Sequence, residues 1–198
     1  MSDIYLVKGM ELHFGIKSPP HTLAFFYDRS IENIFRKYCG KGVESTKEMI
    51  AELKEKNSII IIAHPFMRFV SGIDEKTLNG LLESEKTKTD AIEWNCQVPK
   101  IFDNFELIFP YRKKVLSYSN EKLIPVVVGI DSVLGDVENA GYSVMKFKST
   151  NLNLENPAEL RRSFKQCLTY DALKNGNLKN VFRTISCKSF VANLFDIG

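Results

Sequence analysis

The sequence predicts an α/β fold in which mostly parallel strands form a sheet or barrel with helices outside it. Three observations support this prediction. Five consecutive apolar residues, Ile59–Ala63, read as a strand buried on both faces, which needs packed layers above and below it. A helical pattern ends immediately before that strand. The same helix-then-strand rhythm continues along the chain as far as residue 147.

The first segments predict a β-hairpin. Residues 4–14 mix β-branched and aromatic side chains around Gly9 and read as one strand or two short pieces. A turn rich in Gly and Pro covers residues 15–20, and residues 21–27 form the second candidate strand. In an antiparallel pair, the end of the first strand lies beside the start of the second. We therefore expect His21 to lie near Glu11 and His13.

Two helices are predicted before the buried strand. Residues 30–38 have apolar side chains at helical spacing, and Ser45–Glu48 has the pattern of a capping box that would open a helix ending near Lys56. His64 follows the buried strand, where α/β folds line their ligand crevices. Pro65 takes the chain out of the sheet and favours an extended backbone at His64.

The remaining elements continue this alternation. The core is expected to occupy residues 1–150, and residues 151–198 form a helical C-terminal segment packed on it, with a mixed tail after Gly176. The predicted elements are a helix at 74–84, a strand at 90–96, a helix at 110–122, strands at 123–129 and 141–147, and a helix from 156 to Gly176.

Composition narrows the functional classes. The 198 residues are 44% apolar and 26% charged, as in ordinary globular domains, and the net charge of +3 is too small to indicate a nucleic-acid surface by itself. The four cysteines form no Cys-x-x-Cys pair, which favours a reduced intracellular setting. No apolar run has the length of a membrane span, and the first residues do not resemble a signal peptide. We expect a cytoplasmic protein without a membrane partner.

Metal-capable side chains gather at the predicted strand ends. All three histidines belong to this set, and carboxylate and imidazole together suit zinc, manganese or iron and can activate water for hydrolysis. Taken singly, a histidine after a strand is more often a local hydrogen-bonding group, and a carboxylate there often caps a helix. The set is Glu11, His13, His21, His64, Glu93 and Asp131.

Five segments in order resemble the motifs of the PHP (polymerase and histidinol phosphatase) family, over roughly residues 4 to 147. The resemblance implies an incomplete distorted (β/α)7 barrel with divalent metal ions at its carboxyl mouth. It also implies hydrolysis of phosphate esters, with a phosphorylated small molecule or nucleotide as substrate. The segments are Gly9-Met-Glu11, His21-Thr-Leu-Ala-Phe-Phe, Ile-Ile-Ala-His64-Pro-Phe, Ala-Ile-Glu93-Trp-Asn95 and Val-Val-Val-Gly-Ile-Asp131-Ser.

By position, the resemblance implies that Glu11, His21, His64 and Asp131 are metal ligands, and that catalysis depends on His64 and Asp131. Arg68 is the candidate contact for a substrate phosphate. His13 and Glu93 are candidate accessory residues.

The chain departs from the family pattern in two ways. The opening His-x-His motif and the first strands are absent, and Val133 stands where the family has the histidine of Asp-x-His. Fewer than three ions and reduced or absent activity are therefore expected. One alternative is a non-catalytic scaffold that binds protein, or whose barrel is completed by a second copy or a partner chain.

A weaker alternative is an RNA-binding subunit resembling the barrel-like protein of ribonuclease P. Basic residues from two parts of the chain would contact phosphate groups. They are Lys100, Arg112, Lys113, Lys114, Lys174, Lys179, Arg183 and Lys188.

Overall fold

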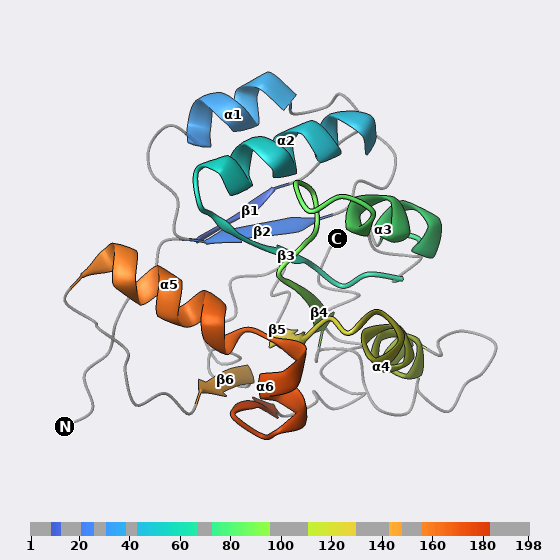
Figure 1. Cartoon of the computed structure of the whole chain (residues 1–198). Coiled ribbons are helices and arrows are strands. Elements are labelled where there is room, and N and C mark those ends of the chain that lie inside the picture. The colour runs from blue at the N-terminus through green and yellow to red at the C-terminus, as the bar shows by residue number, and fades with distance from the viewer. Residues whose placement is uncertain are drawn as a thin grey trace, which may run out of the picture.

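The computed structural model (Figure 1) describes residues 9–12, 21–25, 31–38, 43–66, 73–95, 111–129, 143–147 and 156–182. The strands are β1 (Gly9–Leu12), β2 (Thr22–Phe25), β3 (Ile59–Ile62), β4 (Ala91–Asn95), β5 (Val126–Gly129), β6 (Ser143–Phe147) and β7 (Leu178–Phe182). The helices are α1 (Ile31–Tyr38), α2 (Val43–Glu55), α3 (Glu75–Leu82), α4 (Tyr111–Lys122), α5 (Pro157–Cys167) and α6 (Tyr170–Lys174).

The central element is an open mixed sheet with strand order β1-β2-β3-β4-β5. The β1–β2 and β2–β3 pairs are antiparallel, and the β3–β4 and β4–β5 pairs are parallel. Four of its strands therefore run in one direction, and β2 alone runs against them. The carboxyl ends of β1, β3, β4 and β5 and the start of β2 meet at the same end of the sheet.

Each face of the sheet carries its own apolar core. Figure 1 shows α1 and α2 above the sheet with α3 and α4 to its right, while α5 and α6 lie to its lower left. On one face, β3 contributes Ile60 and Ile62, which pack with apolar residues of α1–α4. On the other face, Ile59 and Ile61 pack with Leu168 at the end of α5. A strand covered on both sides explains why β3 reads as an uninterrupted isoleucine run.

Strands β6 and β7 form a separate antiparallel pair beside β5. The side-chain amide of Asn180 on β7 donates a hydrogen bond to the carbonyl oxygen of Val126, 2.7 Å away. This bond ties the small sheet to the beginning of β5.

The predicted α/β architecture is confirmed, but some predicted boundaries are wrong. Helix α2 begins at Val43, so Ser45 lies inside it and does not cap it. The buried stripe of α2 starts at Thr46 and continues through Met49, Ile50 and Leu53. The helix thus begins two residues before the position that the capping pattern predicts, and the burial of its apolar face contributes more to its stability than a local cap does.

The helix predicted from 156 to 176 is two helices. Leu168 leaves the helical conformation with φ −89° and ψ 67°, and its side chain is buried. The Thr169 hydroxyl then accepts a hydrogen bond from the Ala172 amide and starts α6. Strand β7, at the end of this segment, was not predicted.

Within the described ranges, no helix is both long and apolar enough to cross a bilayer.

Candidate metal centre

The candidate metal centre lies at the end of the sheet where the carboxyl ends of β1 and β3 meet the start of β2. Glu11 is on β1, and His21 immediately precedes β2. The Ala63 amide donates a hydrogen bond to the carbonyl oxygen of His21, so the backbone ladder continues one residue beyond the strands. This ladder holds His21 next to His64, the residue after Ala63.

Three predicted ligands converge there. The Nδ1 atom of His21 lies 2.7 Å from Oε1 of Glu11. The rings of His21 and His64 meet edge to face, with centroids 4.9 Å apart and an interplanar angle of 79°. One ligand atom from each of Glu11, His21 and His64 lies within 4.8 Å of the other two. The predicted proximity of His21 to Glu11 is confirmed.

Burial is graded across the cluster. The side chain of Glu11 is 34% exposed, that of His21 is 10% exposed and that of His64 is 1% exposed. The carboxylate therefore stands at the rim and the His64 imidazole at the base. A ligand could enter past Glu11.

Within the part of the chain that the structure describes, the buried His64 imidazole lacks hydrogen bonds at both of its ring nitrogens, Nδ1 and Nε2. A buried polar group left in this state costs about 1–3 kcal/mol. Such a cost is offset where the nitrogen binds a ligand, and imidazole nitrogen is a common metal ligand.

Glu93 on β4 supports His64 from the side. Its Oε2 accepts a hydrogen bond from the His64 backbone amide at 3.2 Å and lies 3.6 Å from Nδ1 of the same residue. The Glu93 side chain is 8% exposed. The carboxylate therefore holds the His64 backbone by a hydrogen bond and places a negative charge beside the imidazole.

Gly129 leaves room for that carboxylate. β4 and β5 pair so that Asn95 is opposite Gly129, and Glu93 is two residues before Asn95. A β-carbon built on Gly129 would lie 1.5 Å from Oε1 of Glu93. The sequence interpretation missed this role, although a glycine at the end of a buried strand often marks a close approach by another group.

The backbone at His64 differs from the prediction. Its φ is +29°, so the extended conformation expected before Pro65 is wrong. The amide of Phe66 donates to the carbonyl oxygen of Ile73 at 2.8 Å, and Glu93 accepts from the His64 amide. These two bonds hold a turn in which non-glycine residues are strained. Strain of this kind gathers at functional sites.

Several predicted site residues fall outside the described residues. These are His13, Arg68, Asp131 and Val133. Their roles remain predictions. The described cluster contains Glu11, His21 and His64, with Glu93 in contact with His64.

The donor set fits a divalent transition metal after small movements. Two ligands at about 2.1 Å from a tetrahedral ion lie about 3.4 Å from each other. The 2.7 Å contact between Glu11 and His21 would open by several tenths of an ångström, and the largest separation of 4.8 Å would close. One carboxylate and two imidazoles are typical of zinc, manganese or iron sites.

Comparison of the chain with protein-family models and with curated proteins finds no match in either.

Proposed function

We propose that this protein is a metal-dependent phosphoesterase-like hydrolase of the PHP type, with a divalent ion held by Glu11, His21 and His64. The observation that carries the proposal is the buried His64 imidazole, whose ring nitrogens lack partners among the described residues beside a carboxylate and a second imidazole. Zinc, manganese and iron suit these ligands, and Asp131 would complete the set.

The sheet supports the corresponding fold. We propose that the sheet is part of an incomplete distorted (β/α)7 barrel that β6 and β7 extend, and that Leu168 at the end of α5 fills the open side facing Ile61 and Val127. The contact from Asn180 to β5 and the packing of Leu178 against this face favour that interpretation. The ligands would then stand at the carboxyl mouth, where such barrels carry their active sites.

Each residue has a distinct part in the proposed chemistry. A bound divalent ion would lower the pKa of a water molecule enough for hydroxide to form near neutral pH. His64 and His21 would supply imidazole nitrogens, and Glu11 would add negative charge at the rim. Glu93 would orient His64 through the backbone amide. Arg68, four residues after His64 in the sequence, would bind the phosphate of a small phosphorylated substrate.

The test measures metal binding and turnover together. Purified protein is stripped of metal, and zinc or manganese binding is followed by calorimetry and by the shift in thermal unfolding temperature. Hydrolysis of p-nitrophenyl phosphate is then measured with the better metal. The wild type should bind the metal and hydrolyse p-nitrophenyl phosphate, whereas His64→Leu should lose both metal binding and hydrolysis. Absence of metal binding by the wild type would overturn the metal centre.

Val133 makes the non-catalytic scaffold the second candidate, because valine replaces a family ligand and cannot bind metal. The same experiment separates the two functions. Metal binding that depends on His64 without any turnover would favour a scaffold with a structural ion. An oligomer that dissociates when the ion is removed would favour a barrel completed by a second copy.

The described basic residues support RNA binding less well. Lys114 pairs with Glu75 at 3.0 Å, and the Arg112 guanidinium lies 4.4 Å from the Trp94 ring centroid. Lys174 lies 5.3 Å from the ring centroid of Tyr170. These cations make local contacts on α4 and α6, and they come from two separate helices.

A further inference from the structure

A cavity lies at the end of the sheet opposite the metal centre, beside the amino ends of β4 and β5. Its volume is about 450 Å³, within the usual range for small-molecule sites. Asp90, immediately before β4, and Pro125, immediately before β5, form part of its wall. The metal centre belongs to the carboxyl ends of the strands, so the two sites are separated by the length of the sheet.

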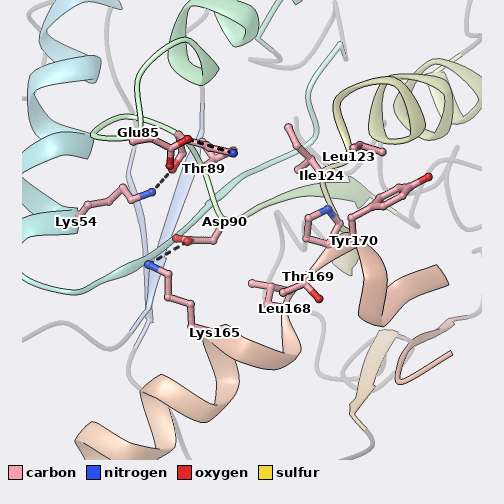
Figure 2. Close-up of a pocket in the computed structure, with 12 residues that line it drawn as sticks. Lys54, Glu85, Thr89, Asp90, Leu123, Ile124, Lys165, Leu168, Thr169 and Tyr170 are labelled. Atoms are coloured by element: carbon pink, nitrogen blue, oxygen red, sulfur yellow. Dashed lines mark hydrogen bonds and ion pairs between the residues drawn. The ribbon is translucent and has the colours of Figure 1, made fainter. Parts of the chain in front are cut away.

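Lysines from three parts of the chain line this cavity: Lys54 of α2, Lys88 before β4 and Lys165 of α5. Figure 2 shows the side chains of Lys54 and Lys165 directed from two sides toward the region of Asp90. Lys54 contacts the backbone carbonyl of Lys88, and Lys165 lies 3.3 Å from Oδ1 of Asp90. The ammonium groups are therefore held at the cavity by contacts with the protein.

The charges leave the inner part of the cavity positive. Asp90 is 8% exposed at its side chain, and its other oxygen accepts from the Ile60 amide. Glu85 is 88% exposed, where water screens its charge. Near Asp90, Lys54 and Lys165 carry two positive charges against one negative charge. Burial lowers the pKa of Lys54, so its charged form lacks part of the solvation it has in water.

The other side of the cavity is apolar. Leu168 is buried at its base, and Leu123 is 64% exposed, with a φ of +54°. The hydroxyl of Tyr170 donates to Asn120 at 2.9 Å, which fixes the position of the aromatic ring. Figure 2 shows Tyr170 and Leu123 across the cavity from the two lysines. An exposed leucine beside a fixed ring is a suitable surface for the organic part of a ligand.

We propose that this cavity binds a small organic phosphate, with the phosphate group between Lys54 and Lys165 and the organic group against Leu123 and Tyr170. Two ammonium groups can donate to the phosphate oxygens, and the net positive charge that remains beside Asp90 favours an anion over a neutral ligand. The site is independent of the metal centre and needs no metal ion.

The test uses the full chain in the presence of a chelator, with phenylphosphonate as a ligand that cannot be hydrolysed. Calorimetry should detect binding to the wild type. Lys54→Met and Lys165→Met should each weaken binding at least about tenfold, because each removes a charge-assisted contact. Lys165→Arg should retain binding, which separates loss of charge from loss of folding. The matched control is Lys113→Met, because Lys113 is exposed on α4.

Two further comparisons sharpen the result. Leu123→Ser should weaken the binding of phenylphosphonate more than the binding of inorganic phosphate, because only phenylphosphonate has an organic group. His64→Leu should bind phenylphosphonate as the wild type does. Equal binding by wild type, Lys54→Met and Lys165→Met would overturn the proposal, as would binding that is lost only in His64→Leu.

Discussion

The two ends of the central sheet carry groups of opposite chemical character. The carboxyl end presents lone pairs, on the Glu11 carboxylate and the His21 and His64 imidazoles. The amino end presents N–H donors, on Lys54 and Lys165. One sheet therefore offers a place for a cation at one end and for an anion at the other. The contrast shows that the side chains that follow or precede the strands, and not the strand direction alone, set the chemical character of each end.

The two ends also differ in how their buried polar groups are satisfied. Both carboxylate oxygens of Asp90 have partners, in the Ile60 amide and Lys165. The His64 ring nitrogens have no hydrogen-bond partner among the residues that the structure describes, and Nδ1 lies 3.6 Å from Oε2 of Glu93. A satisfied buried group fits a structural role, whereas an unsatisfied imidazole beside a carboxylate and a second imidazole supports a ligand site.

The largest expected effect comes from His64→Leu. Leucine fills a similar volume and has no polar atoms to leave unsatisfied, so the metal-free variant should be at least as stable as the metal-free wild type. Metal at 100 times its dissociation constant should stabilise the wild type by about 2.7 kcal/mol and leave the variant unchanged. Urea unfolding with and without metal measures both. A metal-free variant less stable by several kcal/mol would show that His64 has a structural role.

The next effect is that of Gly129→Ala. The new methyl group would overlap Glu93 and force its carboxylate away from His64, at a cost of about 1–3 kcal/mol in unfolding free energy. Metal affinity should fall about 10–100-fold, as for loss of a group that orients a ligand. Urea unfolding and metal titration check the two effects.

Gly80→Ala is the matched control for Gly129→Ala. The new β-carbon meets only the end of the Lys47 side chain, at 3.5 Å, and Gly80 lies inside α3. Stability should rise by about 0.5–1 kcal/mol, with metal affinity unchanged. Similar losses of metal affinity in both variants would contradict the role given to Gly129.

A smaller effect is expected at Asp74, a carboxylate with a local role. Asp74 caps α3 by accepting from the Thr77 amide at 2.8 Å, and that hydrogen bond holds the pKa of Asp74 below its usual 3.8. Asp74→Ala should cost about 1 kcal/mol near neutral pH and leave metal affinity intact. Because the folded pKa is lowered, this contribution is present above the unfolded pKa and is lost as pH falls through the folded value. Unfolding of wild type and variant across acidic pH measures this loss.

The smallest expected effect is a change in how the unfolding free energy depends on pH, caused by Lys54 at the amino end of the sheet. Burial lowers the pKa of Lys54 below 10.5, so between the folded and unfolded values the unfolded chain binds more protons. Stability should therefore rise with pH through that window, and Lys54→Met should remove this part of the slope. Urea unfolding near neutral pH and at pH about 10 provides the comparison. Identical slopes in the two proteins would place Lys54 in a solvated position.

The sequence predicted the elements that follow from local patterns. The isoleucine run gave β3, and the turn between the first strands predicted the hairpin that places Glu11 beside His21. The first and last residues of helices and strands were harder to predict where tertiary packing determines them. Helix α2 begins two residues before its capping pattern, and the short strand β7 depends on pairing with β6.

Only the part of the site that lies at strand ends was predicted from the sequence. Convergence of Glu11, His21 and His64 was predicted because all three lie at predicted strand ends and because the hairpin brings His21 beside Glu11. The Glu93 carboxylate occupies the position that a β-carbon on Gly129 would take. This could not be predicted, because it depends on how far the Glu93 side chain reaches from β4 to the paired strand β5. The positive φ of His64 depends on hydrogen bonds to Glu93, which no local pattern contains.

Asp90 lies at the amino end of β4 and helps to set the register between β3 and β4, which affects the carboxyl end of the sheet. Its amide donates to the Ile60 carbonyl oxygen, and its carboxylate accepts from the Ile60 amide, so the pair closes a ring just before β3 and β4 run side by side. Slippage of β4 by one residue would break this ring and turn Glu93 into the aliphatic layer beneath α3 and α4. By holding the register, Asp90 at the amino end of β4 helps to direct the Glu93 side chain toward His64. A variant that lacks the Asp90 carboxylate should therefore displace His64, although the two residues lie at opposite ends of the sheet.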